Sequence, residues 1–514
     1  MAVHDRFLDP GFDAFEERYR LGASQIVSTR RVADLETPVG AYLKIAAGQP
    51  NSFLLESIEG GAARGRYSVI GVSPDLAFRA RGNEAEINLD PQGDPEGYSP
   101  CAEPTLAALR KLVNETRIDL PEGMPPMASG LFGYMGYDCV RLMEDLGRPG
   151  EDALDLPDAV FLRPTIIVIF DNVRDELTIV TPVRPQAALG AREAYEAARA
   201  RIERVTAALD RPLPSAPAAG AGETVKGTPA GKKTAEEYGG MVERAKEYIR
   251  AGDIFQVVLS QRFEIPFALP PLSFYRALRR TNPAPFLFFF ELPGFAIAGS
   301  SPEILVRLRG DKVTIRPLAG TRPRGTTAME DEALAAELLA DEKERSEHLM
   351  LLDLGRNDVG RVARPASVKV TEQFQIERYS QVMHIVSHVE GELDPARDCI
   401  DALVGGFPAG TVSGAPKVRA MEIIDELEGD KRGLYAGAVG YFAANGDMDT
   451  CIALRTAVIK DGKVHVRAGA GIVAESDPMA EHRECLNKAR ALFRAADEAV
   501  RFAARSRAPE PVEP

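Results

Sequence analysis

Two pairs of glutamates have the spacing and surroundings that chemistry requires. Glu344 and Glu347 lie three residues apart in the helical stretch 340–358, which places both carboxylates on one helix face. Glu481 and Glu484 repeat this arrangement near the C-terminus. If the two helices converge, each close pair of carboxylates repels by about 4 kcal/mol at an effective dielectric constant of roughly 20, so the site needs a cation. Ligation by oxygen alone favours Mg²⁺. The alternative is a surface helix whose acids only balance neighbouring lysines and arginines.

Two further stretches carry groups suited to binding or proton transfer. Residues 316–325 combine three arginines with two glycines, which is typical of an oxyanion pocket but also of a proline-stiffened surface loop. His384 lies in the strand-like stretch 381–390, about 13 Å along one face from His388, so the two cannot share a metal ion. His384 is therefore either a catalytic acid or base or a buried core residue.

Two glycine-containing loops are suited to close contact with a substrate. The loop 407–420 carries Thr411 and leads into a helix expected at 420–427, whose N-terminus favours an anion. Residues 468–471, Ala-Gly-Ala-Gly, follow a strand but lack the rest of a dinucleotide-binding motif. A better interpretation is backbone contact with a carboxylate, with Arg455 as the partner cation.

The elements that must position these groups are short strands and helices without regular alternation. Strands are expected at 41–45, 52–57, 165–170, 253–262, 286–290, 295–298, 304–308, 312–315, 367–370, 450–459 and 463–467, after an amphipathic helical segment in residues 1–30. This grouping favours an α+β fold with antiparallel sheets. The segment 211–233 is rich in Pro, Ala and Gly and is expected to link a domain at 1–210 to one at 234–500, with a disordered tail at 501–514.

The composition is that of an acidic globular protein, with 45% hydrophobic and 27% charged residues. A formal net charge of −14 argues against nucleic acid as a partner, because phosphate backbones need a basic face. Five scattered cysteines without a C-x-x-C pair indicate a reduced, cytoplasmic setting and no structural zinc. No basic leader with an apolar segment and no apolar run of bilayer-spanning length is present, so neither secretion nor membrane insertion is expected.

Five ordered motifs together resemble the chorismate-utilising enzymes, and most closely the large subunits of anthranilate synthase. They are Pro-Leu-Ala-Gly-Thr-Arg-Pro-Arg-Gly at 317–325, Asp-Glu-Lys-Glu through Asn-Asp at 341–358, Val-Met-His at 382–384, Gly-Ala-Pro-Lys at 414–417 and Ala-Gly-Ala-Gly-Ile-Val at 468–473. The resemblance implies antiparallel sheets packed as a sandwich with helices outside. It also implies the conversion of chorismate and ammonia to anthranilate and pyruvate, with Mg²⁺ as cofactor, as the first committed step of tryptophan biosynthesis.

The resemblance implies roles for individual residues. Glu347 and Glu484 would ligate Mg²⁺, with Glu481 beside them. Thr321, Glu344 and His384 would form the catalytic set, in which His384 assists departure of the ring hydroxyl as ammonia attacks. The residues that would hold chorismate are Gly320, Thr321, Thr411, Tyr435, Arg455, Gly469, Ala470, Gly471 and Lys488.

Two positions separate the chain from sister enzymes. Aminodeoxychorismate synthases usually carry a nucleophilic lysine where Ala319 stands. Isochorismate and salicylate synthases usually carry a lysine base in the stretch equivalent to 253–260, where this chain has Gln256. Ammonia is therefore the nucleophile that remains. Two alternatives stay open, an aminodeoxyisochorismate synthase that stops before pyruvate is lost and a catalytically silent homologue that binds tryptophan.

The resemblance extends to regulation and assembly. Ser57, Pro285, Phe286 and Leu287 would contact tryptophan as a feedback inhibitor. No cysteine stands between glycines as in a glutaminase nucleophile, so ammonia is expected from a separate glutamine amidotransferase subunit, anthranilate synthase component II. The expected assembly is a heterotetramer of two large and two small subunits.

Overall fold

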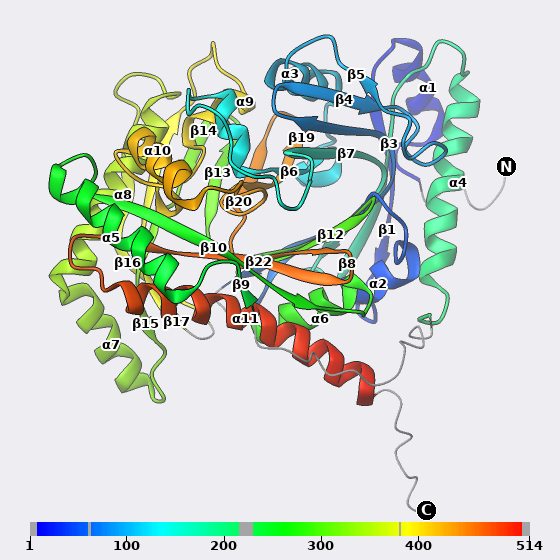
Figure 1. The fold of residues 1–514 in the computed structure, drawn as a ribbon. Coiled ribbons are helices and arrows are strands. Elements are labelled where there is room, and N and C mark those ends of the chain that lie inside the picture. The colour runs from blue at the N-terminus through cyan, green and yellow to red at the C-terminus, as the bar shows by residue number, and fades with distance from the viewer. Residues whose placement is uncertain (1–7, 60–62, 215–229, 380–381, 506–514) are drawn as a thin grey trace, which may run out of the picture.

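A computed structural model describes residues 8–59, 63–214, 230–379 and 382–505. Figure 1 shows its helices mostly around the outside of a large body of β-structure. Within the described ranges the α-helices are α1 (Phe12–Arg20), α2 (Pro38–Ile45), α3 (Thr105–Glu115), α4 (Ala191–Leu209), α5 (Ala235–Ala251), α6 (Pro271–Thr281), α7 (Ala328–Ala340), α8 (Glu342–Gly360), α9 (Cys399–Gly406), α10 (Lys417–Glu428) and α11 (Pro478–Arg505).

The strands of the same ranges are joined by backbone pairing into one continuous network. The first half contributes β1 (Gln25–Val32), β2 (Ser52–Glu59), β3 (Ala63–Arg81), β4 (Glu84–Asn88), β5 (Ser99–Pro100), β6 (Gly130–Met135), β7 (Ala159–Asp171) and β8 (Glu176–Val183). The second half contributes β9 (Ala230–Gly231), β10 (Gln256–Pro266), β11 (Phe286–Leu292), β12 (Phe295–Ser301), β13 (Ile304–Arg309), β14 (Lys312–Ile315), β15 (Leu318–Pro323), β16 (Lys369–Arg378), β17 (Val382–Glu392), β18 (Gly414–Ala415), β19 (Ala438–Ala443), β20 (Met448–Ile452), β21 (Thr456–Lys460) and β22 (Lys463–Ile472). Short 3₁₀ turns lie at η2 (Pro126–Ala128), η3 (Tyr137–Leu142) and η4 (Gly410–Val412).

The two halves of the chain share their sheets. β2 pairs with β11 from Ser52 opposite Glu291 to Ser57 opposite Phe286, and β6 pairs with β19; both ladders are antiparallel. The sheet therefore crosses the boundary expected at 211–233, where residues 215–229 lie outside the described part of the chain. The expectation of antiparallel sheets is confirmed.

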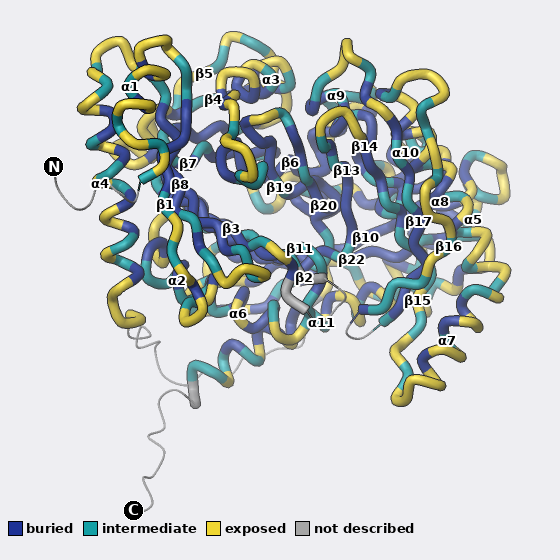
Figure 2. The backbone as a smooth tube through the Cα atoms, turned by 180° about the vertical axis from the view of Figure 1, so that it is seen from behind, coloured by how far each residue is buried: buried dark blue, intermediate teal, exposed yellow. Residues whose placement is uncertain are grey.

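Alternating side chains build a sandwich of two sheet layers. In β11, Phe288 and Phe290 point into an inner core made almost wholly of strand residues, where they meet Phe132 of β6. The intervening Leu287 and Phe289 point the other way, into an outer core beneath helices. In β2, Phe53 likewise points into the inner core and Leu54 into the outer core. The sheets thus pack face to face, and Figure 2 shows the buried strands between more exposed helices.

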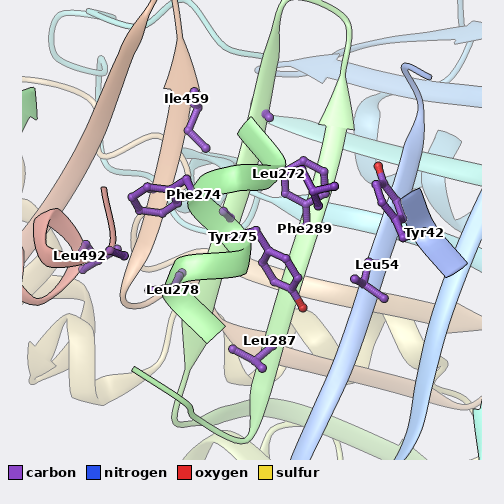
Figure 3. Packing of buried hydrophobic residues seen from close by; sticks show 14 of the residues in the cluster. Tyr42, Leu54, Leu272, Phe274, Tyr275, Leu278, Leu287, Phe289, Ile459 and Leu492 are labelled. Carbon is purple, nitrogen blue, oxygen red and sulfur yellow. The ribbon is translucent and has the colours of Figure 1, made fainter. Parts of the chain in front are cut away.

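Helices cover both outer faces of this sandwich. In Figure 3, Phe274 and Leu278 of α6 and Leu492 of α11 lie against the strand that carries Ile459. The opposite outer core contains Leu352 of α8 together with side chains of α3 and α9. Burying a Leu or Phe side chain contributes about 1.5–3 kcal/mol, so these helices are held mainly by their apolar faces. The layered sandwich with helices outside agrees with the expected fold.

Four local expectations are wrong. The strand expected at 450–459 is divided into β20 and β21, because residues 453–455 leave the extended conformation at Arg455, which has φ +47°. Residues 41–45 form the second half of α2 and not a strand, because Thr37 caps the helix by accepting a hydrogen bond from the Gly40 amide and Pro38 occupies its first turn. The helical segment expected over residues 1–30 is too long, because α1 ends at Arg20 and strand β1 begins at Gln25. At the other terminus α11 continues past residue 501 to Arg505, which shortens the expected disordered tail to residues 506–514, and these lie outside the described residues.

Candidate active site

Strands β15 and β17 place Thr321 beside His384. The two strands pair in antiparallel register around Arg322 and Met383. His384 Nδ1 lies 2.8 Å from the Gly320 carbonyl oxygen and 3.1 Å from Thr321 Oγ1. Because the carbonyl can only accept, Nδ1 carries the hydrogen and Nε2 bears the lone pair. Nε2 is buried and has no hydrogen-bond partner among the described residues, so it is free for a ligand.

The His384 imidazole is neutral at physiological pH. Its side chain is 5% exposed, and burial lowers the pKa to about 4, with the positive charge of Arg455 acting in the same direction. The Tyr379 ring packs edge-on against it, with centroids 5.5 Å apart. A neutral imidazole with a free Nε2 can act as a base or as a hydrogen-bond acceptor.

Helix α8 brings Glu344 against the backbone of β15. The helix begins at Glu342, because Asp341 caps it through the Lys343 and Glu344 amides. Gly320 has φ +69°, and a Cβ there would lie 3.2 Å from Glu344 Oε2. Burial and the negative charge of Glu347 raise the pKa of Glu344. The three-residue spacing of these glutamates therefore places them on one face, as expected.

Glu347 is linked through Gln256 to β22, the strand that contains Gly469 and Gly471. The Gln256 Nε2 donates to Glu347 Oε1 at 3.0 Å. The same nitrogen lies only 2.6 Å from the position that a Cβ on Gly471 would occupy. A Cβ at this position would displace the Gln256 amide, so glycine allows the amide to keep its contact with Glu347.

Glu484 is tied to the same strand through Lys488. Lys488 Nζ contacts Glu484 Oε1 at 2.7 Å and donates to the Gly469 carbonyl at 2.8 Å. The Tyr435 hydroxyl lies 2.8 Å from the position of a Cβ on Gly469, so this glycine too makes room for a side chain. Glu347 and Glu484 thus each contact a side chain that lies beside a glycine of β22.

The carboxylates suit a hard cation without forming a complete metal site of their own. Burial, followed by the charge of Glu484, raises the pKa of Glu481, which parallels the Glu344 and Glu347 pair on α8. Within the described ranges no three acidic, histidine or cysteine side chains gather closely enough to hold a metal ion. Mg²⁺ usually takes one or two protein carboxylates and completes its shell with water and substrate oxygens. The donor set therefore fits Mg²⁺ bound together with a substrate.

Arg455 lines a basic depression of about 890 Å³ along α11, together with Val382, Glu484 and Lys488. Arg455 has φ +47°, an uncommon conformation for an arginine. Its guanidinium forms no ion pair within the part of the chain that the structure describes, and burial lowers its pKa. An unpaired, partly buried guanidinium is suited to bind a substrate carboxylate.

Comparison with known proteins identifies the family of this chain. The sequence profile of the chorismate binding enzymes matches residues 90–494. Anthranilate synthase component 1 of Cereibacter sphaeroides is 54% identical over 96% of this chain and 99% of its own length, and that of Pseudomonas aeruginosa is 47% identical over 93% and 98%. The chain belongs to the chorismate-binding enzymes, in the anthranilate synthase component 1 group.

Solved structures share the fold of this chorismate-binding enzyme. Anthranilate synthase component I from Streptococcus pneumoniae superposes with a TM-score of 0.73 at 36% identity, covering 90% of this chain and 98% of that one. The menaquinone-specific isochorismate synthase of Escherichia coli superposes with a TM-score of 0.68 over 94% and 99%, and at 20% identity it shows the fold alone. No helix within the described residues is long and apolar enough to cross a membrane.

Glu303 is a candidate functional residue that the sequence analysis missed. It follows β12, is 5% exposed, and faces the Thr411 hydroxyl and the Leu318 amide. Burial raises the pKa of this carboxyl to about 8, so it holds a proton at neutral pH. The Thr411 hydroxyl is itself buried without a well-formed hydrogen bond. The Ser-Pro-Glu sequence between two apolar strands was the available signal, because a glutamate there is forced inward.

The four residues expected at a tryptophan site line a second cavity. Ser57, Pro285, Phe286 and Leu287 lie on the wall of a cavity of about 800 Å³, where β2 and β11 pair. The other walls are formed by residues that no sequence motif indicates: Glu56, Arg66, Tyr67, Met127, Glu303, Arg307, Arg309, Glu377, Tyr379, Gly440, Tyr441, Asp449 and Cys451. They come from strands far apart in the sequence, so the structure brings the expected residues together in a site of mixed charge.

Proposed function

We propose that this chorismate-binding enzyme is the large subunit of anthranilate synthase. Its reaction joins chorismate and ammonia and yields anthranilate, pyruvate and water. Ammonia forms a bond to the ring as the ring hydroxyl leaves, and loss of the enolpyruvyl group as pyruvate with a ring proton restores aromaticity. The product is the first committed intermediate of tryptophan biosynthesis.

The observation that carries this proposal is that buried polar atoms without well-formed hydrogen bonds lie on elements that hold residues of the candidate site. Among the described residues they include His384 Nε2, the Thr411 hydroxyl and Gln256 Oε1. Unsatisfied buried polar atoms cost about 1–3 kcal/mol each, so these atoms favour a bound polar substrate. Arg455 adds the positive charge that a carboxylate of chorismate needs.

The proton for the leaving hydroxyl is better assigned to Glu303 than to His384 alone. At neutral pH Glu303 is protonated, with its pKa raised to about 8 by burial, whereas His384 is neutral, with its pKa lowered to about 4 by burial. A group can donate a proton only from its protonated form. Glu303 then acts as the acid, and His384, oriented by Gly320 and Thr321, accepts a hydrogen bond or a proton through Nε2.

Binding of the substrate carboxylates is assigned to the remaining groups. Glu347 and Glu484 would hold Mg²⁺, which supplies positive charge to a substrate carboxylate when bound. Gln256 and Lys488 hold these two glutamates in place. Glycines 469 and 471 leave room beside β22 for the Tyr435 hydroxyl and the Gln256 amide.

Regulation and assembly complete the proposal. Tryptophan, the end product, would bind in the cavity lined by Ser57 and Leu287 and reduce activity. The name component 1 of the relatives suggests a second component. We propose that this partner is a glutamine amidotransferase that supplies ammonia within a heterotetramer. The five cysteines are all free, which supports a reduced, cytoplasmic location.

One assay tests the proposal. Purified protein is mixed with chorismate, Mg²⁺ and an ammonium salt at mildly alkaline pH, and anthranilate is followed by its fluorescence, with and without a chelator or tryptophan. Product that requires Mg²⁺ and decreases with tryptophan is expected. Consumption of chorismate with a product whose mass retains the enolpyruvyl group would instead identify an aminodeoxyisochorismate synthase. No turnover in the presence of the amidotransferase partner would contradict an enzymatic function.

A further inference from the structure

A fully buried ion network lies directly behind the substrate-facing wall of the proposed active site. Glu428, at the end of α10, is 2% exposed, and its Oε1 accepts hydrogen bonds from the Ser260 amide at 2.7 Å and the Ser260 hydroxyl at 2.9 Å. Arg432 contacts both oxygens of Glu428, at 2.6 and 3.0 Å, and Arg467 contacts Oε2 at 3.0 Å. Burial favours the neutral form of Glu428, but the two guanidiniums outweigh it and lower the pKa. The carboxylate is therefore ionised and fully paired.

Arg432 connects this carboxylate to four separate segments. Its Nη1 donates to the Val412 carbonyl at 2.7 Å, and Nη2 donates to the Val258 carbonyl at 2.6 Å. Its guanidinium also stacks on aromatic rings, 4.7 Å from the Tyr137 centroid and 5.6 Å from that of Tyr435. A planar guanidinium can satisfy all these partners at once, and an ammonium group cannot.

Apart from the segment of Tyr137, these segments carry or adjoin expected substrate contacts. Val412 follows Thr411 in η4, and Tyr435 places its hydroxyl against Gly469. In the ladder of β10 with β22, Val258 is the register partner of Gly471 and Ser260 that of Gly469. The network thus bonds the backbone of β10 at the two positions that support the glycines.

We propose that Arg432, held by Glu428, is a positioning residue that sets Thr411, Tyr435 and the Gly469–Gly471 segment at the spacing chorismate binding needs. The inference rests on the proposed function, because it names what the positioned groups bind. Arg432 does not face the substrate, so it acts through the atoms to which it bonds. A displacement of about 1 Å in such groups can cost up to about 100-fold in rate.

The main alternative is that the network only stabilises the fold. Buried ion pairs often contribute little net stability compared with apolar residues, which weakens that alternative. The two roles differ in their consequences. A purely structural arginine, once the protein has folded, leaves the Michaelis constant for chorismate unchanged, whereas a positioning arginine does not.

The Arg432→Lys variant distinguishes the positioning role from a purely structural role. Lysine keeps the positive charge beside Glu428 but lacks the fork that reaches the Val412 and Val258 carbonyls. We expect KM for chorismate to rise about 10-fold while kcat falls less than about 3-fold, with cooperative unfolding retained. The matched control is Arg419→Lys, on the exposed face of α10, where Arg419 pairs with Asp253 and Glu422. A folded Arg432→Lys protein with wild-type KM would overturn the proposal.

A second variant and a structure keep the test decisive if the lysine variant does not fold. Ser260→Ala removes only the hydroxyl between Glu428 and Arg467, so a rise in KM of about 3-fold is expected with an intact fold. Crystal structures of the ligand-free variants should show the Tyr435 ring and the Val412 carbonyl displaced. This displacement does not depend on turnover, so an inactive wild-type protein would refute the proposed function, and unmoved groups would refute the positioning role.

Discussion

At the scale of single residues, the site depends on two buried titratable groups whose pKa values move in opposite directions. Burial raises the pKa of the Glu303 carboxyl to about 8 and lowers that of the His384 imidazole to about 4. The same physical cause acts on both, because a low-dielectric interior disfavours whichever form is charged. Both groups are consequently neutral at pH 7, one with a proton to give and one with a lone pair to accept.

Replacing Glu303 with glutamine should remove the proton donor while keeping the shape of the side chain. We expect Glu303→Gln to lower kcat at least about 100-fold with little change in KM. In the wild type, kcat at a fixed concentration of free ammonia should fall as the pH rises through about 8, because the acid is then ionised. Glu291→Gln is the control, since burial also raises the pKa of Glu291, but it lies on β11 away from Thr411. A variant with full activity would exclude Glu303 as the acid.

The same group makes a prediction about stability. The folded-state pKa of Glu303, about 8, lies above the ordinary value of 4.5, so the folded protein retains a proton that the unfolded chain releases between these values. This contribution to stability is fully present below about pH 4.5 and is lost as the pH rises through about 8. Thermal unfolding between pH 6 and 9 should therefore show a decrease in the wild type that Glu303→Gln lacks. Parallel curves for the two proteins would contradict the raised pKa.

At the scale of elements, most of what the sequence predicted concerns helices and strands with strong local signals. The helical spacing of Glu344 and Glu347 was sufficient to predict helix α8, and the alternation around His384 was sufficient to predict strand β17. Each of these patterns depends on neighbours within one element. The strand expected at 41–45 is wrong because its apolar residues suit either structure, and the Thr37-Pro38 helix start decides between them. Local pattern thus predicts the elements but not every choice between helix and strand.

Gly320 offers a test of how an element positions the catalytic groups. It has φ +69°, and a Cβ would lie 3.2 Å from Glu344 Oε2, so Gly320→Ala both strains β15 and presses on that carboxylate. We expect kcat/KM to fall by at least about 30-fold. Gly310→Ala is the matched control, because Gly310 has φ +58° and a Cβ there meets nothing within 4 Å. It should destabilise the protein by about 1 kcal/mol and leave kcat/KM unchanged. Equal activity of the two variants would show that Gly320 has no specific role.

At the scale of the whole molecule, the site and the cavity share a wall that no sequence pattern reveals. Glu303 and Tyr379 line the second cavity, whose wall also contains Ser57. Glu303 also faces Thr411, and Tyr379 packs on His384. These residues come from segments far apart in the chain, and their proximity follows from which strands pair and how the two sheets stack. The resemblance could supply Ser57 and Leu287 from motifs, but the remaining walls required the three-dimensional arrangement.

This shared wall predicts that filling the cavity uncouples inhibition from catalysis. Ser57 Oγ donates to the Tyr67 carbonyl at 3.0 Å on the cavity wall, and Ser57→Phe would place a ring in the space proposed for tryptophan. We expect the tryptophan concentration for half-inhibition to rise at least about 10-fold, with activity in its absence within about 2-fold of wild type. Because the chain contains no tryptophan, indole emission reports the bound ligand against a background of tyrosine alone. Ser57→Ala, which removes the hydroxyl without filling the space, should retain most of the binding. If Ser57→Phe still bound tryptophan and responded to it as the wild type does, the inhibitor would have to act from another site. The wall shared by the active site and the cavity lined by Ser57 would then have no part in regulation.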